Sequence, residues 1–300
     1  MAASERLQIV TANNKVLNLL SPYTLQEING VNLPGTQDRV TRSPEQSGAT
    51  YLGALVEPRS IILTILIKGC TRNELGTLRK ALSTFFNPRV APLQLRIFLG
   101  DGTRYRLKKL ACQGPIEGPI RYEGSAISQT IGIKLIAYDP MWYSDILKSG
   151  TLTPTQAAQL VFPTFFGASG TFFFGVASVA GSVNVQTLGD WDAAPIIDIF
   201  GPLSRPTVTN ETTGETIELI YEVALGETVT ITTTPGARDV YSNVSGRLQK
   251  YLVDGDFATF HLEPDSLIAP NGINTLSLRG ATSGVAANMA VYWYDRYTGV

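Results

Sequence analysis

The chain contains a single histidine, His261, and few other residues suited to nucleophilic or acid–base chemistry. A Ser-His-Asp site would need this histidine as its base, because histidine both accepts and returns a proton near neutral pH. The sequence has no G-x-S-x-G segment that would present an exposed serine on a nucleophile elbow. We therefore expect His261 to lie exposed on a strand over Asp256–Leu262, and we predict no catalytic residues.

Metal-binding residue types are equally sparse. One histidine and two cysteines, Cys70 and Cys112, cannot complete a four-ligand zinc site without carboxylates, and their spacings match no zinc pattern. Asp254–Asp256 begins like a calcium loop, but the alternating acidic ladder does not follow, so a turn is expected. Gly100–Gly102 is a hairpin turn by the same reasoning, because no helix opens after it to cradle a phosphate. The sequence predicts no metal site and no cofactor.

Two other kinds of site stay open. Glycoside hydrolysis needs two carboxylates at a set separation, and the acidic C-terminal half offers many that the sequence cannot pair. Aromatic side chains such as Trp191 and Trp293 could stack on a saccharide, which leaves a carbohydrate-binding β-sandwich for host-surface recognition as the alternative function. Most aromatic residues in sandwiches pack in cores and subunit interfaces, so a structural protein is favoured over an enzyme.

The composition is that of a β-rich globular protein. Charged residues make up 16% of the chain, which has 28 Gly and 17 Pro and recurrent Val, Ile, Thr and aromatic residues. The net charge of −1 hides an asymmetry, since residues 1–148 hold 18 Lys or Arg and 11 Asp or Glu, whereas residues 149–300 hold 6 and 14. The basic residues are scattered, so we predict no specific nucleic-acid binding.

The chain has only two cysteines, which suggests a protein made in a reducing compartment. We expect Cys70 and Cys112 to be buried free thiols, although a disulfide between them stays open.

Residues 149–189 carry no charge, and Leu160–Gly181 has the length of a membrane span. Because Pro163 and several glycines interrupt that segment, we interpret it as buried strands and loops and predict no stable membrane insertion. The N-terminus lacks the apolar core of a signal peptide.

The elements that carry these residues fall into two units. Ile61–Lys68 is predicted to be a fully buried strand, and the capping-box spacing of Thr71 and Glu74 opens an amphipathic helix after it. A hairpin over Leu93–Leu110 and a strand over Ile127–Tyr138 complete an α+β unit. Beyond it, short alternating segments separated by turn residues predict an antiparallel sandwich.

This order of elements, with the first unit closing on Asp139–Tyr143 (DPMWY), is similar to that of the distal tail protein family of long-tailed, siphovirus-type bacteriophages. Turn motifs of the second unit occur in the order of the family's C-terminal pattern. They are Gly189–Pro202 (GDWDAAPIIDIFGP), Pro206–Asn210 (PTVTN), Thr212–Glu215 (TTGE), Leu225–Glu227 (LGE) and Asn271–Asn274 (NGIN). The resemblance covers roughly residues 60–300, and the motif glycines and asparagines are typical turn residues.

The resemblance and the element pattern together predict a fold that is mainly β with one helix in the N-terminal domain. An α+β, ring-forming domain is expected over residues 1–145, and a C-terminal antiparallel β-sandwich of galectin-like or jelly-roll type over residues 146–300. The resemblance implies a structural hub protein without enzymatic activity, which forms a ring, usually hexameric, between the tail tube and the tail tip or adsorption device.

The resemblance also implies partners and a location. The partners are further copies of the same chain, the tail tube protein, the tail-tip or tail-associated lysin hub protein and, in some phages, receptor-binding or side-fibre proteins. The location is the distal end of the virion tail, after synthesis and assembly in the host cytoplasm.

Overall fold

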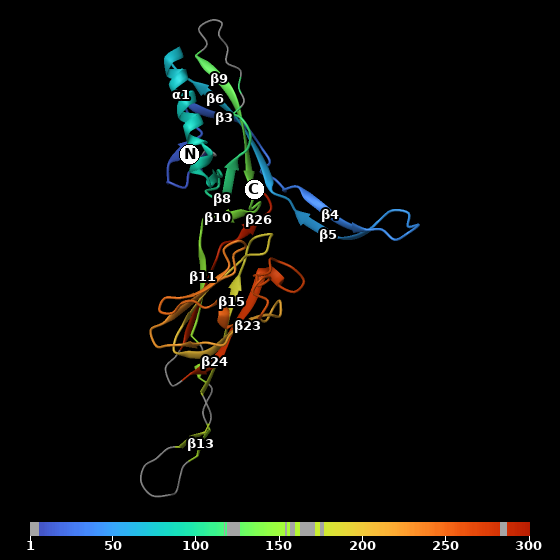
Figure 1. The fold of residues 1–300 in the computed structure, drawn as a ribbon, viewed down its shortest axis with the longest axis vertical. Coiled ribbons are helices and arrows are strands. Elements are labelled where there is room, and N and C mark those ends of the chain that lie inside the picture. Colours follow the sequence, from blue (N-terminus) through green and yellow to red (C-terminus); the bar gives the residue numbers. More distant parts are fainter. Residues whose placement is uncertain are drawn as a thin grey trace. The chain divides into compact units, whose positions relative to one another are not determined.

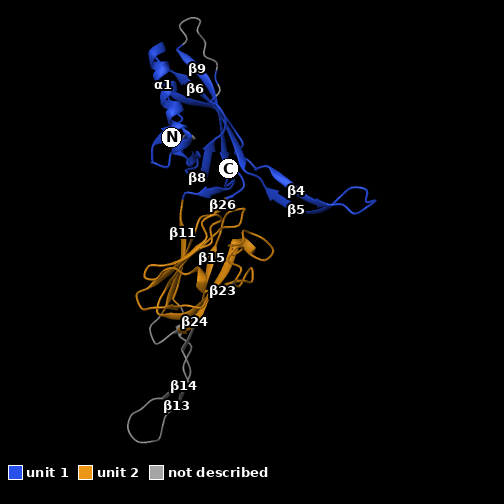
Figure 2. Cartoon of the chain, in the orientation of Figure 1, with its two compact units in different colours: residues 1–145, 297–300 blue, residues 146–296 orange. Residues whose placement is uncertain are grey.

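The computed structural model describes residues 6–116, 118, 127–153, 155–156, 160–162, 172–174, 177–282 and 287–300. The chain divides into two compact units (Figure 2): Met1–Asp145 with Tyr297–Val300, and Ile146–Arg296. Both are built mainly of β-strands, and α1 (Arg72–Phe85) is the single α-helix within the described ranges. The predicted fold class is confirmed.

The first unit is a sheet with one helix. Its path runs β2-β1-β7-β8-β9-β6-β3, β10 also pairs with β8, and β26 pairs with β10. The strands are β1 (Arg6–Val10), β2 (Val16–Asn18), β3 (Tyr23–Asn29), β4 (Thr36–Thr41), β5 (Thr50–Val56), β6 (Arg59–Lys68), β7 (Leu93–Phe98), β8 (Arg104–Cys112), β9 (Ser128–Ala137), β10 (Trp142–Ser144) and β26 (Arg296–Tyr297), with a 3-10 turn η1 (Pro88–Val90).

Strand β6 organises this sheet. It pairs antiparallel with β9 along its whole length, from Arg59↔Ala137 to Lys68↔Ser128. Its odd-numbered apolar residues, from Ile61 to Ile67, are fully buried in the same core cluster as residues of α1, which lies alongside β3 and β6 in Figure 1. Ile62 on the opposite face is 45% exposed. The prediction that this strand is buried on both faces was therefore wrong, because the helix covers only one face of the sheet.

The helix begins where its capping residues predict. The Thr71 side chain accepts a hydrogen bond from the Glu74 N–H at 3.2 Å, and the Glu74 carboxylate accepts one from the Cys70 N–H at 2.7 Å. Leu75 and Leu82 point from the helix into the core. Two N–H groups near the helix start thus find acceptors, and the apolar stripe fixes which side of the helix meets the sheet.

The second unit is a sandwich of two antiparallel sheets, ordered β11-β25-β16-β20-β21-β22 and β12-β15-β24-β17-β18-β23, with β19 beside β17. The elements are β11 (Lys148–Leu152), β12 (Thr155–Gln156), β13 (Leu160–Phe162), β14 (Phe172–Phe174), β15 (Ala177–Gln186), β16 (Ile196–Phe200), β17 (Leu203–Asn210), β18 (Glu215–Leu219), β19 (Glu222–Val223), β20 (Thr228–Thr232), β21 (Asp239–Ser242), β22 (Gly246–Arg247), η2 (Gln249–Tyr251), β23 (Leu252–Gly255), η3 (Pro270–Gly272), β24 (Ile273–Thr282) and β25 (Asn288–Trp293).

The core of the sandwich lies between its two sheets. Ile197 and Ile231 from the first sheet and Val208, Ile217 and Leu278 from the second are fully buried in one cluster. Alternating inward-facing residues from two sheets interdigitate in this way in sandwiches generally. The short alternating segments predicted for this unit supply the inward-facing residues of this core.

Part of the uncharged stretch 149–189, namely residues 154, 157–159, 163–171 and 175–176, lies outside the described residues. Its described parts include β11, which pairs with β25, and β15, which pairs with β24 from Ala177↔Thr282 to Gln186↔Ile273. No helix in the described part of the chain is both long and apolar enough to cross a membrane.

Candidate functional site

A two-stranded hairpin in the first unit has no core of its own. Strands β4 and β5 pair only with each other, from Thr36↔Val56 to Thr41↔Thr50, and we call residues 35–58 the arm (Figure 1). None of the residues 35–58 is buried, and Leu52 and Leu55 are 65% and 53% exposed. Isolated hairpins are marginally stable in water, and clustered exposed apolar residues mark interaction surfaces. The arm is therefore a candidate binding surface.

The root of the arm is held by a buried arginine, Arg59. Its guanidinium donates hydrogen bonds to the carbonyl oxygens of Gly30 and Val31 at 2.9 Å and of Pro140 at 2.7 Å. It also donates to the carbonyls of Asn32 and Thr298. Arg59 thereby joins the segment that leads into the arm to the strand that leads out of it.

Burial lowers the pKa of Arg59 to about 10, because the charged guanidinium is withdrawn from water. The acceptors around it are neutral carbonyls, and the ring of Trp142 lies 5.7 Å from the guanidinium carbon. The arginine still carries its proton at neutral pH, so it satisfies several carbonyls at once. Sequence reasoning missed this residue, since nothing in its neighbourhood distinguishes it from a surface arginine before a strand.

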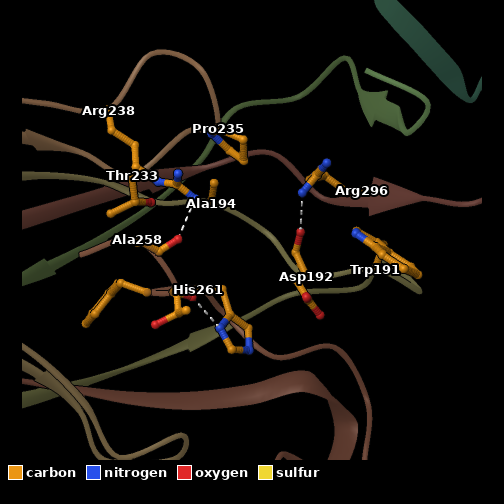
Figure 3. A pocket seen from close by; sticks show the side chains of 11 residues that line it. Trp191, Asp192, Ala194, Thr233, Pro235, Arg238, Ala258, His261 and Arg296 are labelled. Atoms are coloured by element: carbon orange, nitrogen blue, oxygen red, sulfur yellow. Dashed lines mark hydrogen bonds between the residues drawn. The ribbon is translucent and has the colours of Figure 1, made fainter. Parts of the chain in front are cut away.

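The second unit contains a cavity of about 430 Å³ that His261 lines (Figure 3). The residues around it are Trp191, Asp192, Ala194, Thr233, Pro235, Arg238, Ala258, Thr259, Phe260, His261 and Arg296. Arg296 donates to the carbonyl oxygen of Asp192 at 2.8 Å, and Arg238 donates to that of Ala258. The cavity thus has an aromatic side chain, a carboxylate and an imidazole on its wall.

His261 is held by groups on both of its ring nitrogens. Nδ1 lies 2.8 Å from the carbonyl oxygen of Thr259 and 3.1 Å from Oε2 of Glu215, and Nε2 lies 3.0 Å from Oε2 of Glu263. Burial opposes protonation, but these hydrogen bonds and the charges of Glu215 and Asp192 outweigh it and raise the pKa of His261 above its ordinary value.

The prediction of a strand over Asp256–Leu262 was wrong. The N–H groups of Thr259 and Phe260 both donate to the carbonyl of Asp256, at 2.8 and 2.6 Å, which makes a turn, and only Leu262 forms a bridge. His261 is partly buried, with 25% of its side chain exposed, rather than on an open strand face. The Asp256 carboxylate accepts a hydrogen bond from the Thr216 N–H at 3.1 Å.

The other candidate residues lie apart from this cavity. Cys70 and Cys112 are both free, as expected, but neither is fully buried. Cys70 is exposed because it stands at the entrance to α1, and Cys112 is partly buried. The turn at Gly100–Gly102 is confirmed, with the Asp101 carboxylate accepting from the Thr103 N–H at 2.8 Å. Trp293 is 5% exposed in the sandwich core, so of the two tryptophans named above only Trp191 can meet a ligand in this cavity.

Comparisons with known proteins concern the first unit and the whole fold separately. Residues 13–137 match the family model of the phage tail protein RIFT-related domain. No curated protein matches the sequence. The solved structure of the SPP1 Dit (gp 19.1) protein, described as a paradigm of the hub adsorption apparatus in phages that infect Gram-positive hosts, superposes with a TM-score of 0.62 at 10% identity. The match covers 97% of this chain and 98% of that chain.

A second pair of structures gives the same fold. The phage P2 baseplate in its activated conformation, solved with Ca and with Sr, superposes with a TM-score of 0.51 at 10% identity in each case, over 99% of this chain and 100% of that chain. At such low identity the likeness establishes the fold, and the superposition extends over nearly the full length of both chains.

Proposed function

Since this chain is a phage tail protein that resembles the distal tail family, as its sequence predicts, we propose that copies of it form a closed, hexameric ring that joins the tail tube to the tail tip. The matched domain and the fold support a structural phage tail protein of the hub or baseplate type. The ring, its stoichiometry and its position in the tail are the proposal.

The exposed arm is the observation that carries the ring proposal. Apolar side chains of the arm, such as Tyr51, Leu52 and Leu55, stay in water when the chain is alone, so the arm buries little apolar surface by itself. That surface is buried if a neighbouring subunit covers the arm. A contact between an arm and a different surface of the next subunit is heterologous, and such contacts close into rings when the rotation permits.

The arm's rigid root supports this role. Because Arg59 holds residues 30–32 beside the start of β6, the arm leaves the first unit at a defined point. Successive subunits can then make the same contact at the same angle, which a closed ring needs. A freely hinged arm would instead permit assemblies of mixed geometry.

The proposal includes the division of labour between the two parts of the chain. Residues 1–145 would form the ring, and residues 146–300 would project from it. The basic first half and the acidic second half would favour one orientation when subunits associate. The proposed neighbours are the tail tube protein, the tail-tip or tail-associated lysin hub protein and receptor-binding or side-fibre proteins, at the distal end of a virion tail assembled in the host cytoplasm. We propose no catalytic function.

The oligomeric mass of the purified chain tests the ring. We expect light scattering to give a mass near six subunits and negative-stain images of the same peak to show rings with a central channel. A double substitution, Leu52→Asp with Leu55→Asp, should release monomers because it places charges in the covered apolar surface. Leu267→Asp is the matched control, because Leu267 is fully exposed in the second unit.

Two results would count against the ring. One is a stable monomer at concentrations near those in a virion, and the other is a ring that survives the arm substitutions unchanged. Circular dichroism of the double variant separates loss of assembly from loss of folding, since an arm without buried residues can change without disturbing the core.

Trp191 on the wall of the His261 cavity favours one alternative, a carbohydrate-binding β-sandwich. An indole face beside polar side chains is a common way to hold a sugar ring. Binding on a glycan array that disappears in Trp191→Ala would support it. Trp293→Ala does not serve as a test, because Trp293 lies in the sandwich core and its loss would destabilise the unit.

A further inference from the structure

A short antiparallel bridge brings three potential metal ligands to one face of the second unit. Ala193 and Leu262 exchange two backbone hydrogen bonds, of 3.0 and 2.8 Å, and both side chains are fully buried. Side chains alternate between faces along an extended segment, so those next to a buried pair point the other way. Asp192 stands opposite Glu263 across this bridge, and His261 lies two residues before Glu263 on the same face.

The three side chains lie close together in the folded unit. One ligand atom each from Asp192, His261 and Glu263 lies within 4.8 Å of the other two, and all three residues are partly buried. Zinc binds nitrogen and carboxylate oxygen at about 2.0–2.2 Å, so small side-chain rotations would bring these atoms to coordinating distance. In Figure 3, Asp192 and His261 lie next to each other on the cavity wall.

The hydrogen-bond acceptors around His261 determine which ring nitrogen would bind a metal. The Thr259 carbonyl and the Glu215 carboxylate both face Nδ1 as acceptors, so Nδ1 would keep its proton in a metal complex. Nε2 hydrogen-bonds the Glu263 carboxylate in the metal-free chain and would give up its proton to the metal. A carbonyl or carboxylate behind a ligating histidine is the usual arrangement at metal sites.

The carboxylate ligands are prepared as well. Asn274 fixes the backbone of Glu263 on both sides, since its side chain accepts from the Glu263 N–H at 2.9 Å and donates to the Glu263 carbonyl at 2.8 Å. No hydrogen bond to the Asp192 carboxylate is found within the described part of the chain, so it stays available to a cation.

We propose that Asp192, His261 through Nε2 and Glu263 bind a divalent transition metal of the Zn²⁺ class, with a further coordination position open to the adjoining cavity. One imidazole with two carboxylates suits Zn²⁺, Mn²⁺ or Co²⁺ better than Ca²⁺, which prefers six or more oxygen ligands. The metal would link the segment before β16 to the loop before η3. This inference is independent of the proposed ring.

The site also explains why the sequence predicts no metal. His261 and Glu263 are two residues apart, but Asp192 is far from them along the chain, and no ligand spacing connects them. The bridge between Ala193 and Leu262 supplies the connection, and it exists only in the folded chain.

Titration of the chelator-stripped, tag-free full chain with ZnCl₂ in a calorimeter tests the proposal. We expect one ion per chain, and with CoCl₂ the visible absorption bands of a low-coordinate nitrogen–oxygen site. The work should be done with Cys70→Ser, because Cys70 is an exposed thiol that could bind zinc itself. Asp192→Asn and Glu263→Gln should each weaken binding at least about tenfold, and Glu215→Gln should do so by about 10–100-fold through the histidine.

Glu222→Gln is the matched control, because Glu222 is an exposed carboxylate of the same unit outside the cavity. Circular dichroism shows whether each variant is folded. Three results overturn the proposal: no saturable Zn²⁺ binding by the folded chain, binding that Asp192→Asn and Glu263→Gln leave unchanged, or Ca²⁺ binding as tight as Zn²⁺ binding.

Discussion

At the scale of single residues, the turn motifs that carry the family resemblance include buried polar anchors. Asn210 and Asn274 are fully buried, and the Asn210 amide donates to the carbonyl of His261 at 2.8 Å and to the Asn274 side chain at 3.3 Å. Glu227 is 3% exposed and accepts hydrogen bonds at both oxygens. Such residues hold loops in place because each one satisfies several buried backbone groups.

Arg59 provides the sharpest residue-scale prediction. Arg59→Met leaves several buried carbonyls without donors, and we expect it to destabilise the first unit by about 3–5 kcal/mol. Arg59→Lys keeps the charge but has fewer donors in a different geometry, and it should recover only part of the loss. Urea unfolding measures both, with Arg39→Met on the exposed arm as control. Equal stability of the Met variant and the wild type would contradict a stabilising role of the hydrogen bonds that Arg59 donates.

Glu227 predicts a pH dependence. Burial raises the pKa of its carboxyl, but hydrogen bonds from Ser242, Tyr221 and the Ala224 N–H prevail and lower it. A carboxyl whose pKa is lowered by folding contributes stability above its unfolded pKa of about 4.3, and that contribution disappears as pH falls through the folded pKa. Glu227→Gln should therefore cost about 1.5–3 kcal/mol at pH 7.

The measurement for Glu227 is urea unfolding of both proteins between pH 7 and pH 3. The difference in free energy of unfolding should stay constant down to about pH 5 and then shrink, since the wild type progressively loses the advantage of its ionised carboxylate. A difference that does not change with pH would show that Glu227 acts through packing alone.

At the scale of elements, local capping and amphipathicity determine where α1 forms, whereas the arm forms through the pairing of β4 with β5. The capping residues and the apolar stripe of the helix are local, and the helix forms where they predict. The arm has no regular alternation of apolar and polar residues and no buried face, so its residues 35–58 gave no distinct strand signal. Its pairing is visible only because β4 and β5 face each other in the fold.

The helix cap gives an element-scale prediction. Thr71→Ala removes the acceptor of the Glu74 N–H and should destabilise the first unit by about 1 kcal/mol. Thr77→Ala is the control, because Thr77 lies in the middle of the same helix, where alanine is the better helix former. Thermal unfolding should show a lower midpoint for the first variant only, and equal midpoints would mean that the cap adds nothing.

At the scale of the whole molecule, the chain has two separate cores, and each is drawn from one unit. Within the second unit, Lys148 and Asp295, near its two ends, form an ion pair of 2.7 Å. The Asp295 carboxylate also accepts from the Leu188 N–H at 3.0 Å. The beginning and end of the sandwich are thus tied together inside one unit.

We therefore expect a fragment of residues 146–296 to fold on its own. Its near-ultraviolet circular dichroism should match a packed β-protein, and its urea midpoint should coincide with one of the transitions of the full chain. Lys148→Met in the fragment should lower that midpoint, because it leaves the buried Asp295 carboxylate unpaired. A fragment that binds hydrophobic dyes and unfolds without cooperativity would contradict an independent second unit.

The sequence by itself determined the fold class, the course of β6 to β9, the helix and its cap, and the antiparallel sandwich of the second unit. These features depend on local periodicity and turn chemistry, which neighbouring residues encode. Motif order likewise sufficed for the resemblance to a tail protein family.

Only the tertiary structure decided the rest. It buried one face of β6 and not the other, placed Arg59 against carbonyls from distant segments, turned Asp256–Phe260 away from a strand and brought Asp192 to His261. Each of these outcomes depends on contacts between residues far apart in the chain, and the free energy of such contacts is set by three-dimensional neighbours that a linear pattern does not contain.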